Sequence, residues 1–257
     1  MHLNFLTLKR QSHFLGTRAA GAKIHESFTQ VKNEWILRLL SRDEDELFLQ
    51  LSCHPRYPFI IINNSITRQQ NSTTVMGGVA GLRIKDLTTI PGERILKMTF
   101  VESKMALMIH MFTTNSNFFL IDENGSTINS FKKSKSLKGK GYSIPESSRL
   151  DISAIPLSEF IEIAQREPEE QLAGFLKSTF FHLSQTVIRE LFFRLDIPGN
   201  AIIQSLTTDQ MENLYKDSLN FLKACQEDQP EIYFQEKLPH TLSLTHLQHL
   251  SWIRNPR

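Results

Sequence analysis

The fold of this chain is decided by two stretches, GERILKMTF at residues 92–100 and TNSNFFLIDENG at residues 114–125. The first places the acid–base pair Glu93-Arg94 at the start of an apolar segment that is typical of a strand. The second opens with the polar corner Asn115-Ser116-Asn117 and continues as an apolar strand. It ends at Asp122–Gly125, where an Asn-Gly step predicts a hairpin. The pair and the corner are therefore expected at strand ends, where side chains are available to bind a ligand.

Apolar segments on either side continue this pattern and predict a strand-rich first half. Strands are expected over residues 23–30, 34–40, 47–52, 59–63, 83–89, 95–101, 106–111, 118–121 and 127–131. A helix is expected over residues 3–15, where apolar side chains recur with helical spacing. The continuous run Phe59–Ile62 predicts a strand that is buried on both faces. Ser72 or Thr73 is expected to cap a helix that Gly77 and Gly78 keep short.

The second half of the chain predicts helices, so the expected fold class is α+β. The helices are expected over residues 157–166, 169–179, 184–195 and 207–225, with Ser184 and either Thr207 or Thr208 as N-caps. We expect a strand-rich domain over residues 1–148 and a helical domain over residues 149–225. Residues 226–257 show little periodicity and are expected to be a tail or the start of a coiled-coil region.

The composition is typical of a folded protein with a net charge close to zero. Of the 257 residues, 40% are hydrophobic, which supports a packed core. The net charge is only +2, so a basic surface for nucleic acid must be local. Cys53 and Cys225 match no metal-ligand spacing, and two free thiols are favoured over one disulfide. The start of the chain lacks the apolar region of a signal peptide, and no run is long enough to span a membrane. We therefore expect a cytoplasmic location.

Residues 132–140 are the best electrostatic candidate for a binding surface. This stretch alternates serine and glycine with five lysines, Lys132, Lys133, Lys135, Lys138 and Lys140. Exposed lysines on a flexible loop can follow a phosphate backbone and make binding salt-dependent. A solvated linker without a binding role is the alternative. Both interpretations remain open at this point.

No other motif indicates an enzyme or a metal site. His54, at a strand end, is either an acid–base group or a structural residue, and the structural role is favoured. His240, His246 and His249 have no acid or cysteine at ligand spacing, so no metal is expected. The sequence contains no glycine-rich phosphate loop, nucleophile elbow or paired-carboxylate motif. We therefore expect a protein without catalytic residues or cofactors.

Four stretches together resemble the N-terminal part of the NFACT family, which includes the bacterial fibronectin-binding protein A-like proteins and RqcH. They are residues 21–39, with Gly21, Gln30 and Trp35, then Leu51–Pro55, Glu93–Leu96 and Ser116–Asp122. Each stretch is short, but their order and spacing match over residues 1–223. Glu93-Arg94 stands where the family has an aspartate-arginine pair, and Ser116-Asn117 stands where it has serine-asparagine.

The resemblance implies a role in ribosome-associated quality control. NFACT proteins bind a large ribosomal subunit that carries a stalled nascent chain, hold tRNA, and promote untemplated C-terminal tailing. The first domain would resemble the N-terminal domain of formamidopyrimidine-DNA glycosylases, and the second would be helix-hairpin-helix-like. The expected partners are tRNA and the large subunit. The residues expected to contact RNA are Glu93, Arg94, Asn115, Ser116, Asn117, Lys132, Lys133, Lys135, Lys138 and Lys140.

The chain departs from the family pattern in several places. Asn4-Phe5 stands where the family has aspartate-glycine, Glu93 replaces an aspartate, and a long helix is reduced to Asn71–Gly81. The family's coiled coil and C-terminal RNA-binding domain have no counterpart in this sequence, so tailing by this chain alone is not expected. The alternatives are a protein-interaction scaffold, a surface adhesin, and a DNA glycosylase-like enzyme. The glycosylases use a proline after the initiator methionine as nucleophile, whereas this chain has His2.

Overall fold

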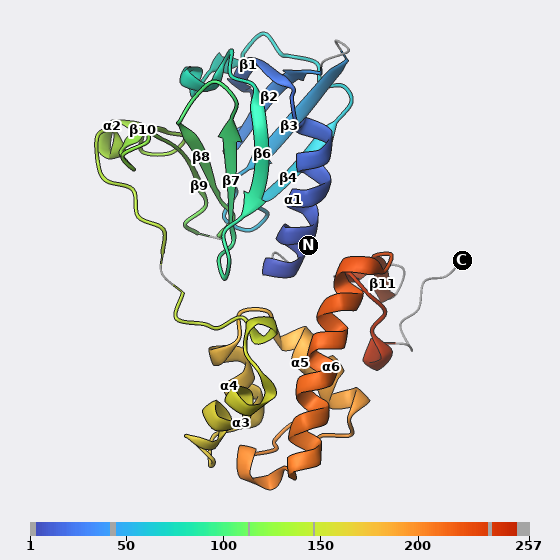
Figure 1. Ribbon diagram of the computed structural model, residues 1–257. Helices are drawn as coiled ribbons and strands as arrows, with labels where there is room; N and C mark the ends of the chain where they lie inside the picture. Colours follow the sequence, from blue (N-terminus) through green and yellow to red (C-terminus); the bar gives the residue numbers. More distant parts are fainter. Residues whose placement is uncertain (1–3, 42–44, 113, 146, 236–237, 251–257) are drawn as a thin grey trace. The chain divides into compact units, whose positions relative to one another are not determined.

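The computed structural model describes residues 4–41, 45–112, 114–145, 147–235 and 238–250 (Figure 1). The chain forms two compact units. The strand-rich unit is Leu8–Pro145, and the helical unit combines Met1–Thr7 with Glu146–Arg257. Antiparallel sheets and helices largely occupy separate parts of the sequence, which confirms the expected α+β class.

Helix α1, Phe5–Ala19, opens the described chain. Asn4 precedes it, and its Oδ1 accepts the N–H of Thr7 at 2.8 Å, so one amide at the helix start is paired. The helix expected over residues 3–15 is confirmed and continues to Ala19. Gly21 then adopts a φ of +79°, which glycine reaches without strain, and turns the chain into the first strand.

The strand-rich unit contains two five-stranded antiparallel sheets (Figure 1). Sheet A has the order β4-β3-β2-β1-β5, and sheet B has the order β10-β9-β8-β7-β6. The strands of sheet A are β1 Lys23–Thr29, β2 Glu34–Leu40, β3 Glu46–Ser52, β4 Phe59–Asn63 and β5 Thr73–Thr74. The strands of sheet B are β6 Ile84–Thr89, β7 Ile95–Phe100, β8 Ala106–His110, β9 Asn117–Ile121 and β10 Thr127–Ser130. All of the expected strands are confirmed, with ends that differ by no more than a residue.

The predicted hairpin joins β9 to β10. The Oδ1 atom of Asp122 accepts the N–H of Asn124 at 2.9 Å and that of Ser126 at 2.8 Å. Gly125 has a φ of +76°, in the left-handed region that favours glycine. The turn is thus specified by an aspartate that bonds to the backbone ahead of it and by a glycine at the strained position.

The core of the strand-rich unit lies between the two sheets. Trp35 on β2 is fully buried, and its ring centroid is 5.6 Å from that of Phe118 on β9. The indole N–H donates to Oγ of Ser27 at 2.9 Å, so burial leaves this donor paired. Burying a large apolar side chain contributes roughly 2–3 kcal/mol. Because a slip of one residue would expose these rings, the buried positions fix the register of the strands.

Two expectations for residues 59–79 are wrong. Ile61 is 37% exposed, because β4 pairs only with β3 and forms an edge of sheet A. Thr73 starts no α-helix; it forms β5 against β1, and only the 3-10 turn η1, Gly77–Val79, follows. The N–H of Val75 continues this pairing by donating to the carbonyl of Ser27 at 3.1 Å. Backbone bonds to β1 therefore take the place of a helix cap.

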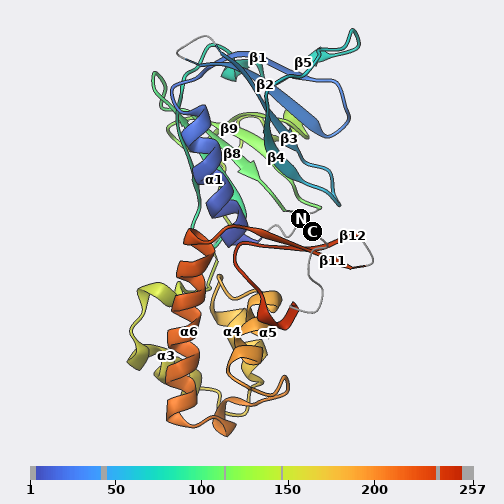
Figure 2. The same ribbon diagram turned by 90° about the vertical axis from the view of Figure 1, so that its right-hand side faces the viewer.

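The helical unit contains the four expected helices (Figure 2). They are α3 Leu157–Gln165, α4 Leu172–Thr179, α5 Gln185–Arg194 and α6 Thr208–Glu227, with 3-10 turns η2 Ile152–Ala154 and η3 Ile203–Ser205. Thr207 caps α6 through a reciprocal pair of hydrogen bonds with Gln210. Ser184 occupies the N-cap position of α5, but its side chain makes no capping bond.

Residues 231–235 and 238–250 differ from the expected tail or coiled coil. They form strands β11 Glu231–Gln235 and β12 Leu238–Ser243, which pair as a hairpin, and the 3-10 turn η4 Gln248–Leu250. The physical reason is burial: Tyr233 is 2% exposed, and Leu244 and Leu247 join the same core as the helices. The helical unit therefore includes a small sheet that periodicity alone does not reveal.

Candidate functional site

Arg94 lies immediately before β7 with its guanidinium over an aromatic ring. The guanidinium carbon is 5.4 Å from the ring centroid of Phe112, a geometry in which the ring face attracts a cation. The carbonyl of Arg94 accepts the N–H of Met111 at 2.8 Å. Arg94 and its neighbour Glu93 are both half-buried. The ring and the backbone bond thus fix the position of this cation at one end of sheet B.

The polar corner divides into an exposed residue and two buried ones. Asn115 is exposed, whereas Ser116 is 1% exposed and Asn117 is 7% exposed. The Nδ2 of Asn117 donates to the carbonyl of Lys132 at 3.1 Å, and its Oδ1 accepts the N–H of Lys132 at 2.7 Å. The Oγ of Ser116 is buried without a hydrogen-bond partner among the described residues. Asn117 therefore holds the start of the lysine stretch against β9.

The stretch from Lys132 to Lys140, expected as a flexible loop or linker, is pinned to the strand-rich unit. The half-buried Lys132 donates from Nζ to the carbonyl of Cys53 at 2.6 Å. Farther along, the N–H of Gly139 donates to the carbonyl of Thr127, and the N–H of Thr127 donates to the carbonyl of Lys140, both at 2.8 Å. Between these fixed ends lies the short helix α2, Ser134–Leu137. Four lysines are exposed on this stretch, namely Lys133, Lys135, Lys138 and Lys140.

Sheet register brings three sequence-predicted groups to one end of sheet B. Ile95, which follows Arg94, pairs with His110, and His110 pairs with Asn117. With a spacing of about 4.8 Å between strands, Asn117 and Ile95 are roughly 10 Å apart. Asn117 in turn bonds to Lys132. The acid–base pair, the polar corner and the start of the lysine stretch therefore converge, although the sequence separates them by up to 39 positions.

A histidine–tyrosine pair lies on the same sheet and was not predicted from the sequence. The Nε2 of His110 and the hydroxyl of Tyr142 are 2.6 Å apart. Burial lowers the pKa of His110 to about 4 and raises the pKa of Tyr142, so both side chains are neutral at pH 7. The available signal was a histidine at the end of the apolar strand Ala106–His110. It says nothing about Tyr142, which lies 32 residues away.

His54 has the contacts of a structural residue. Its Nδ1 accepts the backbone N–H of Arg56 at 3.2 Å and that of Tyr57 at 3.3 Å. Its ring also stacks on the ring of Tyr57, with the centroids 5.5 Å apart. An imidazole nitrogen that accepts backbone amides organises the turn after β3. Cys53 and Cys225 are buried free thiols, the state that was favoured over a disulfide.

The helical unit holds a buried carboxylate that sequence analysis missed. Glu190 on α5 is fully buried, and the Nε of Arg194 donates to it at 2.5 Å. The backbone N–H groups of Gln248 and His249 donate to the same carboxylate at 2.9 and 3.1 Å, and the Nδ1 of His249 lies 2.6 Å from it. Burial alone would raise the pKa of Glu190, but these bonds, led by His249, outweigh it and lower the pKa. The carboxylate ties the turn η4 to α5.

The C-terminal histidines have no acidic residue at ligand spacing in the sequence, but two of them have acidic partners in the folded chain. In space, His249 pairs with Glu190, and the Nδ1 of His246 lies 3.0 Å from Glu231. Such pairs join residues that are 59 and 15 positions apart. Within the described residues, no group of three or more histidine, cysteine, aspartate or glutamate side chains is arranged to hold a metal. Among those residues there is also no helix long and apolar enough to cross a lipid bilayer.

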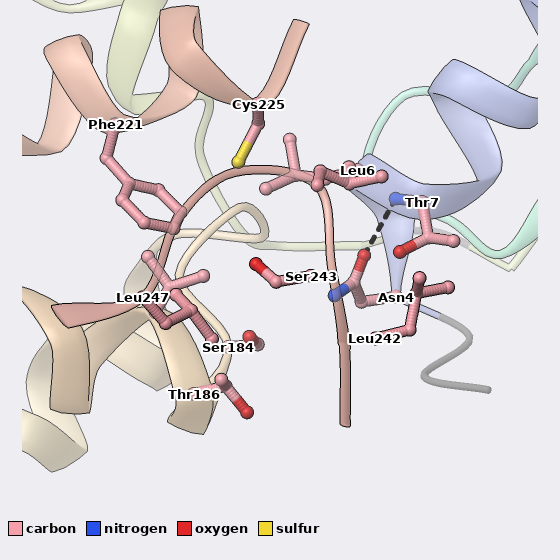
Figure 3. Close-up of a pocket in the computed structure, with 12 residues that line it drawn as sticks. Asn4, Leu6, Thr7, Ser184, Thr186, Phe221, Cys225, Leu242, Ser243 and Leu247 are labelled. Carbon is pink, nitrogen blue, oxygen red and sulfur yellow. Dashed lines mark hydrogen bonds between the residues drawn. The ribbon is translucent and has the colours of Figure 1, made fainter. Parts of the chain in front are cut away.

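A small cavity in the helical unit is lined by the starts of α1 and α5, by α6 and by β12 (Figure 3). Its polar lining includes Asn4, Thr7, Ser184, Thr186 and Ser243. The cavity measures about 30 Å³, which is room for roughly two water molecules. It is therefore too small for a nucleotide or a cofactor, and the convergent end of sheet B is the stronger candidate site.

Comparison with known proteins identifies a family over nearly the whole chain. The family model described as NFACT N-terminal and middle domains matches residues 5–255. Three solved structures share the fold at identities too low to show more than the fold. No curated protein sequence matches significantly.

The three structures align over most of their lengths. The fibrinogen-binding protein from Staphylococcus aureus has a TM-score of 0.77 at 15% identity, covering 98% of this chain and 93% of that chain. The N-terminal part of the fibronectin/fibrinogen-binding protein from Streptococcus suis has a TM-score of 0.67 at 18% identity, covering 95% and 90%. The N-terminal domain of fibronectin-binding protein PavA from Streptococcus pneumoniae has a TM-score of 0.62 at 18% identity, covering 96% and 91%.

Proposed function

This chain belongs to the family of NFACT N-terminal and middle domains, and we propose that it is the tRNA- and large-ribosomal-subunit-binding module of a ribosome-associated quality control factor. In this proposal it binds subunits that carry a stalled nascent chain. It acts in the cytoplasm by binding and contributes no catalytic step. Untemplated tailing is a property of the full-length family and requires parts beyond this module.

The observation that supports this proposal most is the convergence of polar and basic groups at one end of sheet B. Arg94 is held over Phe112 there, and Lys132 is bonded to Asn117. A guanidinium can hold a phosphate or a base edge through two parallel hydrogen bonds. We assign Arg94 a direct RNA contact and Glu93 an orienting role. Of the polar corner, Asn115 is exposed, and we assign it a direct RNA contact as well.

The four exposed lysines of the 133–140 stretch supply the electrostatic part of the site. Lys133, Lys135, Lys138 and Lys140 extend from a backbone whose two ends are hydrogen-bonded to the strand-rich unit. Fixing the backbone reduces the conformational entropy that binding must remove. Lysines that neutralise phosphates release counterions, so binding weakens as salt concentration rises. The proposed site thus combines a positioned arginine with a preorganised cationic edge.

Titration of labelled tRNA with the purified chain tests the proposal, with fluorescence anisotropy as the readout. We expect saturable binding whose affinity falls steeply between about 50 and 200 mM salt. Sedimentation through sucrose with large ribosomal subunits provides the second test, with small subunits as the control. Absence of binding to both tRNA and large subunits would remove the proposed function.

A second candidate is a protein-binding role without nucleic acid. The names of the three similar structures favour it, since those proteins are described as binding fibrinogen or fibronectin. Immobilised fibronectin and fibrinogen, offered to the same purified chain, distinguish the two candidates. Binding to either glycoprotein at physiological salt, together with no binding to tRNA, would favour the second candidate.

A further inference from the structure

Four rings follow one another across the outer face of sheet B. The centroids of Tyr142 and Phe119 are 5.5 Å apart, and those of Phe119 and His110 are 4.8 Å apart. His110 and Phe112 follow at 5.3 Å, with their planes at 89°. We name these four residues the aromatic row. Its members come from β8, β9 and the segments after β8 and β10, so the row crosses several strands of the sheet.

The aromatic row lies on the face opposite to the core between the sheets. Side chains alternate along a strand, and Phe118 points to the Trp35 side, so Phe119 points away from it. Beneath the row lie the buried side chains of Ile95, Ala106 and Met108. Phe112, Phe119 and Tyr142 are each partly exposed. The row is therefore a surface of aromatic rings that packs on buried apolar side chains.

Cations lie at both ends of the aromatic row. At the Phe112 end, the guanidinium of Arg94 sits 5.4 Å from the ring. At the Tyr142 end, the preceding residues include the exposed Lys138 and Lys140, and Lys140 pairs through its backbone with Thr127. Three strand spacings of about 4.8 Å separate β10 from β7, and the register places Thr127 level with Thr99, five residues along β7 from Arg94, so the two cationic ends lie roughly 20 Å apart. A strand of RNA can span that distance with its phosphates at the cations.

The chemistry of the aromatic row suits nucleobases better than a duplex. Proteins that read single-stranded RNA stack roughly two or three unpaired bases on aromatic side chains of a sheet face. A duplex offers only phosphates and groove edges to such a surface, because its bases are already stacked on each other. Stacking tolerates any base, while the cations follow the backbone. The partly exposed ring of Tyr142 adds an uncharged surface, and the buried His110 lies within hydrogen-bond distance of its hydroxyl.

We propose that the aromatic row is a stacking platform for unpaired RNA bases, with Arg94 and the lysines of residues 133–140 holding the flanking phosphates. This inference rests on the proposed function, because the RNA in question is the bound tRNA. Unpaired bases occur both in the loops of tRNA and at its 3′ end. The chemistry is the same for both, and the experiment separates them.

The test measures the affinity of the purified chain for a labelled oligoadenylate RNA of about ten nucleotides and for a blunt RNA duplex of equal length. Phe112→Leu retains apolar volume but removes a ring, and we expect it to weaken oligoadenylate binding by roughly fivefold or more. Phe112→Tyr retains the ring and should restore binding. Tyr57→Leu is the matched control, since Tyr57 is an aromatic residue of the same unit, 71% exposed and outside the row.

Each outcome bears on one of the two proposals. Equal binding of oligoadenylate by the original chain and by Phe112→Leu, with circular dichroism showing both folded, overturns the stacking platform. If both also bind tRNA equally well, the proposed function survives that loss. If the chain binds no tRNA but Phe112→Leu still weakens oligoadenylate binding, the platform stands and the proposed function falls. A tRNA that lacks its unpaired 3′ end shows which bases stack on the aromatic row. If Phe112→Leu no longer weakens binding of this tRNA, the stacked bases are those of the 3′ end. If Phe112→Leu still weakens binding, the stacked bases are those of the loops.

Discussion

Asn117 and Lys132 are joined by two hydrogen bonds between one side chain and one backbone unit. The Oδ1 of Asn117 accepts the N–H of Lys132 at 2.7 Å, and its Nδ2 donates to the carbonyl of Lys132 at 3.1 Å. The side-chain amide thus pairs with both backbone polar groups of Lys132, as a neighbouring strand would. These two hydrogen bonds hold the residues after β10 in a fixed position at the edge of the site.

Asn117→Ala tests that relationship. Removing the side chain leaves the N–H of Lys132 without this partner, whereas its carbonyl still accepts from the Ser130 hydroxyl. An unpaired buried polar group costs about 1–3 kcal/mol. We expect the free energy of opening at the Lys132 amide, measured by native-state hydrogen exchange, to fall by that amount. Asn115→Ala is the control and should change it by less than about 0.5 kcal/mol, because Asn115 is exposed. Unchanged exchange at Lys132 in Asn117→Ala would contradict the assignment.

The lysine stretch gives a prediction about salt. Replacing Lys133, Lys135, Lys138 and Lys140 together by glutamine should weaken tRNA binding and flatten its dependence on salt. Each lost phosphate contact lowers the slope of log affinity against log salt by roughly 0.7–0.9. The matched control replaces Lys9, Lys23, Lys32 and Lys85, which are exposed on the same unit, and changes net charge equally. If both sets change the slope equally, net charge rather than this site governs binding.

His110 gives a prediction about pH. Burial lowers the pKa of His110 to about 4 from an ordinary value of 6.5. Below pH 6.5 the unfolded chain binds a proton at this imidazole, but the folded chain does not until about pH 4. The stability that depends on neutral His110 is therefore complete above pH 6.5 and is lost as the pH falls toward 4. At about 1.4 kcal/mol per pKa unit, the loss reaches roughly 3 kcal/mol.

The measurement is urea unfolding of the strand-rich unit at pH 7 and pH 4.5, for the original chain and for His110→Gln. We expect the free energy of unfolding to fall more on acidification in the original chain than in His110→Gln, because glutamine takes up no proton. The same fall in both chains would show that other groups cause the acid sensitivity.

Most of the strand-rich unit is predictable from the sequence because its strands have clear local sequence patterns. The apolar run of β9 and the Asn124-Gly125 step specify the β9–β10 hairpin locally. Ile61 was misjudged because exposure at a sheet edge depends on which strand lacks a second neighbour. Thr73 was misjudged because its partner, Thr29, is distant in sequence. A local sequence pattern shows neither which strand lies at the edge of a sheet nor which distant strand a residue pairs with.

The candidate site was only partly predictable for the same reason. Arg94 and the lysines stand out because charge next to an apolar strand is visible in the sequence. Asn117 was expected to touch RNA directly, whereas its side chain is bonded to Lys132. His110 acquires its neutral state from burial beside Tyr142, and that contact exists only in the folded chain. A sequence shows which residues have suitable chemistry, but tertiary contacts decide which of them remain accessible.

Glu190 gives a prediction for the helical unit. Its buried carboxylate accepts hydrogen bonds from Arg194 and from the turn η4. Removing one partner of a buried ion pair costs about 3–5 kcal/mol, so Glu190→Gln should lower the free energy of opening at residues 248–249 by roughly that amount. Glu212→Gln is the control, because the Glu212–Lys216 pair is solvent-exposed and such pairs contribute at most about 1 kcal/mol.

The pH dependence of the same contact has a defined sign. The pKa of Glu190 is lowered below its usual 4.5, so the stability that it contributes is present above pH 4.5 and is lost as the pH falls through the lowered value. Hydrogen exchange at residues 248–249 should therefore accelerate as the pH falls below 4.5 in the original chain, after correction for intrinsic exchange. Glu190→Gln should show no such acceleration. Equal behaviour of the two chains would mean that Glu190 does not hold η4.

The central claim is that this family member binds tRNA through the end of sheet B that contains Arg94. The most direct measurement is an anisotropy titration of labelled tRNA, at one salt concentration, with the original chain, Arg94→Ala and the exposed-arginine control Arg56→Ala. We expect the original chain and Arg56→Ala to bind alike and Arg94→Ala to bind at least tenfold more weakly, since a charge-assisted contact contributes about 1.5–3 kcal/mol. Equal affinity of Arg94→Ala and the original chain, or no binding by the original chain, would contradict it.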